Sequence, residues 1–240
     1  MSKVRMTILV PSGSVMPHGT VQPAKKRCIY MSGDRDAGCW ETDYALRGRI
    51  WGGAVHHLPP LGAGLRVLEC GCGNGKTFSA LIEKNCDVVG VDFSSSAAIL
   101  CRTLIPKNAP GNVAIADIRS LPFADASFNS VIAFHVFGHL PEGGRICCAR
   151  ENARVLMDGG TLYFSGFSRE DFRAGTGRET EPGTFERKNG IATHFFSENE
   201  VQALFPDLTV CECCTRRWTM RVLGRSLPRA EITAMFKKTT

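Results

Sequence analysis

The 240-residue chain lacks any apolar run that approaches the roughly 18 residues of a membrane-spanning helix. Its N-terminal apolar run, Ile8–Val10, is too short for the core of a signal peptide, and Pro11 follows it at once. Eleven cysteines are too few for a disulfide scaffold, which carries roughly 8–10% cysteine. We therefore expect a soluble, cytoplasmic protein whose thiols are free.

Several ligand-binding signatures are incomplete. The glycine-rich stretch at 71–75 is followed by Lys76, where a dinucleotide-binding G-x-G-x-x-G pattern would need glycine. Lys76-Thr77 also lacks the first glycine of a P-loop. Cys211-x-x-Cys214 is half of a zinc pattern without a second half, so no metal site is expected.

Hydrophobic residues make up 43% of the chain and charged residues 22%, as in ordinary globular proteins. Short apolar runs alternate with amphipathic stretches, which predicts a doubly wound, mostly parallel α/β sheet of seven strands. The last strand is expected to be antiparallel, at or near the edge. The expected strands are residues 66–70, 87–92, 112–116, 130–134, 161–167, 209–214 and 232–237.

The predicted organisation is a loosely ordered basic extension over residues 1–33 and one domain over residues 34–240. Residues 40–58 are expected to form a cover helix with a Gly-Gly break, and residues 168–195 a long loop that acts as a lid or substrate loop. Both ends of the chain are basic, although the net charge is only +6. The basic ends are either solvated tails or a surface for an anionic partner.

A group of acids and glycines surrounds the first strand-to-helix turn. Glycine at 71, 73 and 75 lets backbone amides approach a ligand closely. Asp92 ends the second strand, where a carboxylate can accept both hydroxyls of a ribose. Asp117 follows the third strand and can accept from an adenine amine, with the amide of Ile118 beside it. Together with Glu69, these acids suit a ligand that carries positive charge and would repel a pyrophosphate.

The segments that carry these residues resemble class I S-adenosylmethionine-dependent methyltransferases, and most of all the type 11 group, which includes quinone-biosynthesis enzymes. The resemblance covers residues 40–170, and its most specific part is the stretch LPFADASF. One departure is Asn129, where the group usually has aspartate. The resemblance implies a Rossmann-like methyltransferase fold, S-adenosylmethionine as cofactor and S-adenosylhomocysteine as product.

The resemblance also implies a role for individual residues. Cover segments of this class often lie over the cofactor, so Arg47 is expected to pair with its carboxylate and Trp51 to shield its sulfonium. The other implied cofactor contacts are Glu69, Gly71, Cys72, Gly73 and Gly75 at the methionine half, Asp92 at the ribose, Phe93, Asp117 and Ile118 at the adenine, and Phe134 and His135 beside the sulfonium.

Methyl transfer from a sulfonium releases a neutral leaving group, so no acid is required. A base is needed only where the acceptor carries a proton at working pH. The candidate bases are His139 and His135, which follow the fourth strand at the face where open α/β sheets bind ligands. His194, Tyr163 and Tyr44 are weaker candidates for contact with the acceptor.

The acceptor and the oligomeric state stay open at this point. The chain has no [DN]-PP-[YFW] motif and no Pro-Cys nucleophile after the fourth strand, which argues against base methylation of those two kinds. A small-molecule acceptor is the first hypothesis. An RNA acceptor, bound by the basic ends, is the second, and a non-catalytic domain that binds the cofactor is the third.

Overall fold

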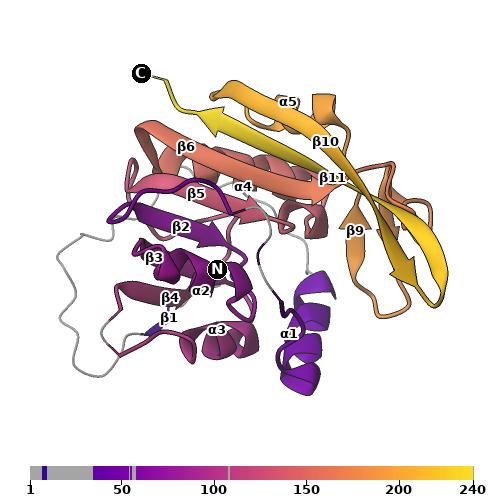
Figure 1. Ribbon diagram of the computed structural model, residues 1–240, viewed down its shortest axis with the longest axis horizontal. Helices are drawn as coiled ribbons and strands as arrows, with labels where there is room; N and C mark the ends of the chain where they lie inside the picture. Colours follow the sequence, from indigo (N-terminus) through magenta and orange to yellow (C-terminus); the bar gives the residue numbers. More distant parts are fainter. Residues whose placement is uncertain (1–6, 10–34, 54, 56–57, 108, 240) are drawn as a thin grey trace, which may run out of the picture.

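The computed structural model describes residues 7–9, 35–53, 55, 58–107 and 109–239 (Figure 1). Its main feature is an eight-stranded sheet. In spatial order the strands are β1 (Thr7–Leu9), β4 (Gly111–Ile115), β3 (Asp87–Asp92), β2 (Arg66–Cys70), β5 (Phe128–Phe134), β6 (Leu156–Phe167), β11 (Arg225–Lys237) and β10 (Thr209–Val222). The helices are α1 (Arg35–Arg47), α2 (Lys76–Glu83), α3 (Ser95–Arg102), α4 (Glu142–Val155) and α5 (Glu198–Leu204), with a 3-10 turn η1 (Phe137–His139).

The five strands from β4 to β6 are parallel, and β11 runs antiparallel between β6 and β10. Leaving β1 aside, this is the predicted seven-stranded sheet with an antiparallel last strand, so the predicted fold class is confirmed. Three residues of the extension predicted over 1–33 form β1, which pairs antiparallel with β4. The rest of that prediction lies outside the described residues.

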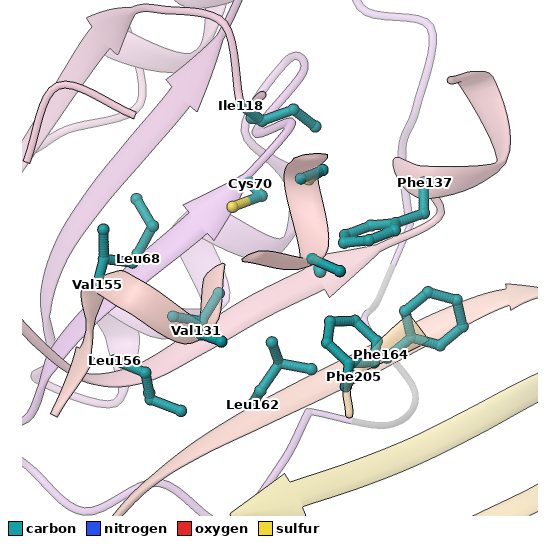
Figure 2. Close-up of a cluster of buried hydrophobic side chains, with 14 of the residues drawn as sticks. Leu68, Cys70, Ile118, Val131, Phe137, Val155, Leu156, Leu162, Phe164 and Phe205 are labelled. Atoms are coloured by element: carbon teal, nitrogen blue, oxygen red, sulfur yellow. The ribbon is translucent and has the colours of Figure 1, made fainter. Parts of the chain in front are cut away.

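The central strands bury both of their faces, because most of their side chains are apolar. Leu68 and Val131 belong to an apolar cluster that includes residues of α4 and α5, which Figure 2 shows in part. Their neighbours Val67 and Ile132 belong to a second cluster with residues of α2 and α3. Two helical layers therefore cover the sheet and leave the carboxyl ends of its strands free to build a site.

The predicted helix over residues 40–58 was wrong in both bounds. The helix begins at Arg35 and ends at Arg47, after which Gly48 adopts a φ of 63° and its N–H bonds to the carbonyl of Tyr44 at 3.0 Å. A glycine in this left-handed conformation is a common helix terminator. Described residues from Arg49 to Leu58 form no helix.

The long loop predicted over residues 168–195 is replaced in large part by a second, three-stranded antiparallel sheet. Its strands are β7 (Arg178–Glu181), β8 (Thr184–Glu186) and β9 (Ala192–His194). Pro182 and Gly183 form the first turn, with Gly183 at a φ of 77°. Strands of three or four polar residues leave no periodicity from which a sequence could predict them.

The basic C-terminal segment forms a long hairpin, so its basic side chains are carried on paired strands. β10 and β11 are 14 and 13 residues long and are joined by Leu223-Gly224, with φ values of 47° and 79°. Two positive φ values in a two-residue loop are the geometry of a type I′ turn, which matches the twist of paired strands. Because β11 pairs with β6 only from Glu231 onward, the tip of the hairpin extends beyond the sheet (Figure 1).

Three properties of the described residues bear on the sequence predictions. No helix in this part of the chain is long and apolar enough to cross a membrane. No group of three or more His, Cys, Asp and Glu side chains within it could hold a metal ion. Cys70, Cys72, Cys86, Cys101 and Cys148 are buried and free, whereas Cys147 is disulfide-bonded, so the expectation of free thiols was wrong for Cys147.

Candidate functional site

A cavity of about 1320 Å³ opens at the carboxyl ends of the parallel strands, where the sequence predicted a ligand site. Three predicted site residues do not line it, namely Gly75, Arg47 and His194. The predicted residues that do line it are Glu69, Gly71, Cys72, Gly73, Asp92, Phe93, Asp117, Ile118, Phe134, His135, His139, Trp51, Tyr44 and Tyr163.

The loop between β2 and α2 needs glycine at two positions that face the cavity. Gly71 has a φ of 69°, and a Cβ there would lie 2.5 Å from a methyl group of Val136. Gly73 has a φ of 52°, and a Cβ there would lie 2.5 Å from the hydroxyl oxygen of Tyr44. Both positive φ and close approach therefore exclude larger residues. Gly75 precedes α2 and has a φ of 86°, so it shapes the loop without facing the cavity.

Asp92 connects this loop to the end of β3. Its buried carboxylate accepts hydrogen bonds from the N–H groups of Gly73, at 2.8 Å, and Ser94, at 2.9 Å. Burial raises the pKa of Asp92 to about 6 in spite of these bonds, and the charge of Glu41 acts in the same direction. The carboxylate is thus fixed in position, and no cation among the described residues is a main influence on its pKa.

Glu69 is a second buried acid at the end of β2. Burial and the nearby Asp92 both raise the pKa of Glu69 well above its usual range. One of its carboxyl oxygens is buried without a hydrogen-bond partner among the described residues. A buried polar atom of this kind indicates that a donor supplied by a ligand belongs beside it. Glu69 and Asp92 together therefore suit a ligand with an ammonium group or hydroxyl donors.

Asp117 lies at the cavity after β4, and Ile118 is buried next to it. Both oxygens of Asp117 are engaged by Arg119, whose Nε and Nη2 atoms lie 2.7–3.0 Å away. A carboxylate has about four acceptor positions, so Asp117 can still accept from a ligand. Arg119 was not anticipated, although a basic residue two positions beyond an acid could have been noted.

Helix α1 and the segment after it cover the glycine loop. The side chain of Asn74 exchanges two hydrogen bonds with the backbone of Trp51, at 2.9 and 2.7 Å. Glu41 accepts from the hydroxyls of Ser94 and Ser96 at 2.6 and 2.7 Å, which joins α1 to α3. Asn74 and Glu41 were both missed, because no local pattern shows that residues this far apart will meet.

Arg47 is not brought to the cavity. Its guanidinium pairs with Asp43 at 3.1 Å, one turn earlier on α1, and its side chain is 61% exposed. The cavity-facing residues of this cover are instead Trp40, Tyr44 and Trp51. Burial and the charge of Asp92 raise the pKa of Tyr44, so its hydroxyl stays protonated.

The two predicted histidines both line the cavity but in different environments. Burial lowers the pKa of His139 to about 4, and its Nδ1 lies 2.8 Å from the carbonyl oxygen of Ala192. A neutral ring in that position donates from Nδ1 to the carbonyl, which leaves Nε2 as an acceptor. His135 has a φ of 54°, stacks on Phe167 at 4.5 Å, and places Nε2 3.3 Å from a carboxylate oxygen of Glu231.

His194 is not an acceptor contact, so that prediction was wrong. The side chain is buried between the second sheet and α5, where Nδ1 lies 2.7 Å from the Thr184 hydroxyl and Nε2 lies 2.6 Å from Glu200. Ser197 caps the start of α5 by accepting a hydrogen bond from the N–H of Glu200. His194 thus connects β8 to α5.

We expect His194→Gln to lower the free energy of unfolding by roughly 1–3 kcal/mol, because it leaves buried polar partners without a matching group. Urea unfolding checks this value, with Lys188→Gln on the exposed surface of the same segment as control. An unfolding free energy equal to that of the control variant would show that the contacts of His194 carry no stability.

The remaining wall of the cavity is built by β6, β11 and β10, and we call it the acceptor wall. Side chains alternate between the two faces of a strand, so every second residue of each strand faces the cavity. The residues of the acceptor wall are Tyr163, Ser165 and Phe167 of β6, Arg229, Glu231, Thr233 and Met235 of β11, and Glu212, Arg216 and Trp218 of β10. Apart from Tyr163, sequence reasoning assigned none of them to the site.

Comparison with known proteins bears on the whole arrangement. Residues 68–164 match the family model described as a methyltransferase domain. The chain is 32% identical over 145 residues to a probable S-adenosylmethionine-dependent methyltransferase of Mycobacterium tuberculosis, covering 60% of this chain and 50% of the relative. It is 31% identical over 125 residues to 2-methyl-6-phytyl-1,4-hydroquinone methyltransferase of Synechocystis, covering 51% and 37%.

A further relative is the tRNA N(3)-cytidine methyltransferase of Gallus gallus, 26% identical over 159 residues, which cover 61% of this chain and 43% of the relative. The chain thus spans half or less of the length of these curated relatives. Among solved structures, an S-adenosylmethionine-dependent methyltransferase from Methanosarcina mazei superposes with a TM-score of 0.64 at 23% identity, covering 76% of this chain and 99% of that one. This last likeness concerns the fold.

Proposed function

We propose that this chain, which carries a class I S-adenosylmethionine-dependent methyltransferase domain of the type 11 family, transfers a methyl group to a small-molecule acceptor. The observation that carries the proposal is the size and continuity of the cavity. Sites for one drug-sized ligand measure roughly 300–1,000 Å³. A cavity of about 1320 Å³ has room for the cofactor and, against the acceptor wall, for a second small molecule.

The described residues fit the cofactor. When bound, S-adenosylmethionine supplies an electrophilic methyl group on a positively charged sulfur. Asp92 would bind the ribose hydroxyls, and the unpartnered oxygen of Glu69 would accept from the amino group. Phe93, 43% exposed at the cavity, and Ile118 would flank the adenine. Phe134 would lie beside the sulfonium, at the junction with the acceptor wall.

The pair of His135 and Glu231 is the base that we propose for an acceptor that carries a proton. The pair spans from the end of β5 to β11 and faces the cavity. An acceptor O–H or N–H would pass its proton to the pair while its oxygen or nitrogen forms the bond to the methyl carbon. The C–S bond breaks and its electrons stay on sulfur. His139, with its low pKa, serves better as a hydrogen-bond acceptor that orients the substrate.

Replacement of Glu231 by glutamine is expected to lower the rate of methyl transfer to a hydroxyl acceptor by roughly 10²–10⁴-fold, the usual contribution of a general base. Affinity for S-adenosylhomocysteine should stay within twofold of that of the native protein, because Glu231 lies on the acceptor side. Single-turnover rates and calorimetric titrations check the two parts. A transfer rate unchanged in Glu231→Gln would remove Glu231 from the chemistry.

Cofactor affinity should rise with pH between about 5 and 7. Because burial holds the pKa of Asp92 at about 6, a fraction of the free protein carries a proton there. A ligand that donates hydrogen bonds favours the carboxylate, so binding lowers that pKa and releases the proton. Titration calorimetry across this range measures the slope, which Asp92→Asn should flatten. Affinity that falls as pH rises would contradict the proposed contact.

An RNA acceptor is the second candidate function. Its support is the similarity to a tRNA methyltransferase and the basic hairpin, which carries Arg217 at the cavity and Arg221 and Arg225 near its turn. Positive charge beside a site attracts a phosphate backbone, and such binding weakens steeply with salt.

A domain that binds the cofactor without transferring its methyl group is the third candidate.

Transfer of a labelled methyl group separates these candidates. The pure protein is incubated with tritium-labelled S-adenosylmethionine and either the low-molecular-weight filtrate or the retained fraction of a cell extract, the latter with and without ribonuclease. Label in products of the filtrate is the expected result. Label confined to ribonuclease-sensitive material would support the RNA candidate, and cofactor binding without label in either fraction would support the third.

A further inference from the structure

Strand register arranges the acceptor wall in rows. Phe167 of β6, Glu231 of β11 and Arg216 of β10 are direct neighbours across the three strands. The next row toward the hairpin tip places Trp218 opposite Arg229. Adjacent strands are about 4.8 Å apart, so the row from β6 to β10 extends for roughly 10 Å. It begins at Phe167, on which His135 stacks, and ends at Arg216.

Three charged residues on or next to this wall have partners of opposite charge or potential charge. Glu231 pairs with His135, toward β5. Arg229 donates to the buried Asp171 at 2.7 Å, and Arg217 forms a two-point pair with Glu170 at 2.6 and 2.7 Å.

Arg216 differs from these residues. It is partly buried and lines the cavity, yet its guanidinium has no hydrogen bond or ion pair with any described residue. Its neighbour Glu231 turns toward His135, and Glu212 lies four residues away along β10, at the other end of the wall. A partly buried guanidinium with a planar set of donors is suited to binding a carboxylate through two hydrogen bonds.

An aromatic surface lies beside Arg216. Trp218 is 41% exposed, and the guanidinium of Arg229 lies 5.3 Å from its ring centre. Phe167, at the other side of the row, carries His135 against its ring at 4.5 Å. The Phe167 ring also carries the guanidinium of Arg173 at 3.8 Å, so the exposed ring of Trp218, in the adjacent row, is the one that favours a flat ligand.

We propose that the acceptor is a planar aromatic carboxylate, bound with its carboxylate on Arg216, a ring beside Trp218 and its far end toward Phe167. The proposal rests on the proposed methyl transfer and names its substrate class. The row of roughly 10 Å places the far end of a two-ring molecule beside Phe167 and His135, where its hydroxyl would face the methyl group. The hydroxyl proton passes to His135 and Glu231, the new O–C bond forms, and the C–S bond breaks with its electrons on sulfur.

The test uses 6-hydroxy-2-naphthoate and its neutral match, 6-hydroxy-2-naphthamide, each titrated by its own fluorescence into the full chain saturated with S-adenosylhomocysteine. Arg216→Gln removes the charge, and Arg221→Gln removes the same charge from an exposed position of the same strand that does not line the cavity. We expect the naphthoate to bind at least tenfold more tightly than the naphthamide. Arg216→Gln should abolish that difference, and Arg221→Gln should leave it unchanged.

Three results would overturn the proposal. They are equal binding of the two probes, an equal effect of the two substitutions, and no binding of the naphthoate to protein that has bound S-adenosylhomocysteine. A chain that fails to bind S-adenosylhomocysteine at all would instead overturn the proposed methyl transfer. Failure of the substrate class and failure of the proposed function therefore give different results.

Discussion

Gly73→Ala is expected to weaken binding of S-adenosylmethionine by about 2 kcal/mol or more, roughly thirtyfold. The positive φ of 52° costs a non-glycine residue roughly 1–2 kcal/mol. The new Cβ would also lie 2.5 Å from the hydroxyl of the buried Tyr44, so either the loop or the cover helix must move. If the loop moves, the hydrogen bond from the N–H of residue 73 to the Asp92 carboxylate is broken. Calorimetric titration measures the loss of affinity.

Two matched variants separate the causes of that loss. Gly64 has a comparable φ of 76°, but a Cβ there would lie in open space. Gly64→Ala therefore measures the effect of backbone strain in the absence of a steric clash. In the double variant Gly73→Ala/Tyr44→Phe the hydroxyl is gone, and the nearest ring carbon lies 3.5 Å away. We expect unchanged affinity in the first variant and partial recovery in the second. Full affinity in Gly73→Ala alone would show that this loop does not contact the cofactor.

Asp92→Ala is expected to weaken cofactor binding by roughly 1–3 kcal/mol, the usual value of hydrogen bonds to a charged group. The substitution removes the acceptor of the ribose hydroxyls and also frees the N–H groups of Gly73 and Ser94. Both effects act in the same direction on affinity. The measurement is again a calorimetric titration, made above pH 7 so that Asp92 is ionised in the native protein.

Asp87→Ala is the control for this substitution. Asp87 begins the same strand that Asp92 ends, and its 44% exposed side chain has a long ion pair of 3.9 Å with Arg66. An exposed pair of this kind contributes little, so cofactor affinity should not change. If the two aspartate variants bound the cofactor equally well, the ribose contact assigned to Asp92 would be wrong.

The central sheet could be predicted because its information is local. The strands β2 and β3 have the predicted bounds, since short apolar runs with a polar residue or glycine after them leave few other conformations. The hairpin strands β10 and β11 extend well past the predicted residues. Their polar ends are strands because of pairing with each other and the turn at Leu223-Gly224, and such pairing is not local.

The site residues also divide into those that local sequence patterns place and those that depend on distant strand pairing. Asp92 and Glu69 could be placed at the cavity because each ends a predicted strand, and neighbouring parallel strands end at one edge of a sheet. Arg216 could not, because its position depends on the register between β10 and β11. Arg47 was placed at the cavity by analogy, yet the helix turns its side chain toward Asp43.

A crystal structure of the complex with S-adenosylhomocysteine tests the central claim most directly. The account predicts ribose hydroxyls on Asp92, the amino group on Glu69, adenine between Phe93 and Ile118, and sulfur facing the acceptor wall beside Phe134. A product molecule bound elsewhere, or one whose ribose does not contact Asp92, would contradict the assignment of this cavity as the site of methyl transfer.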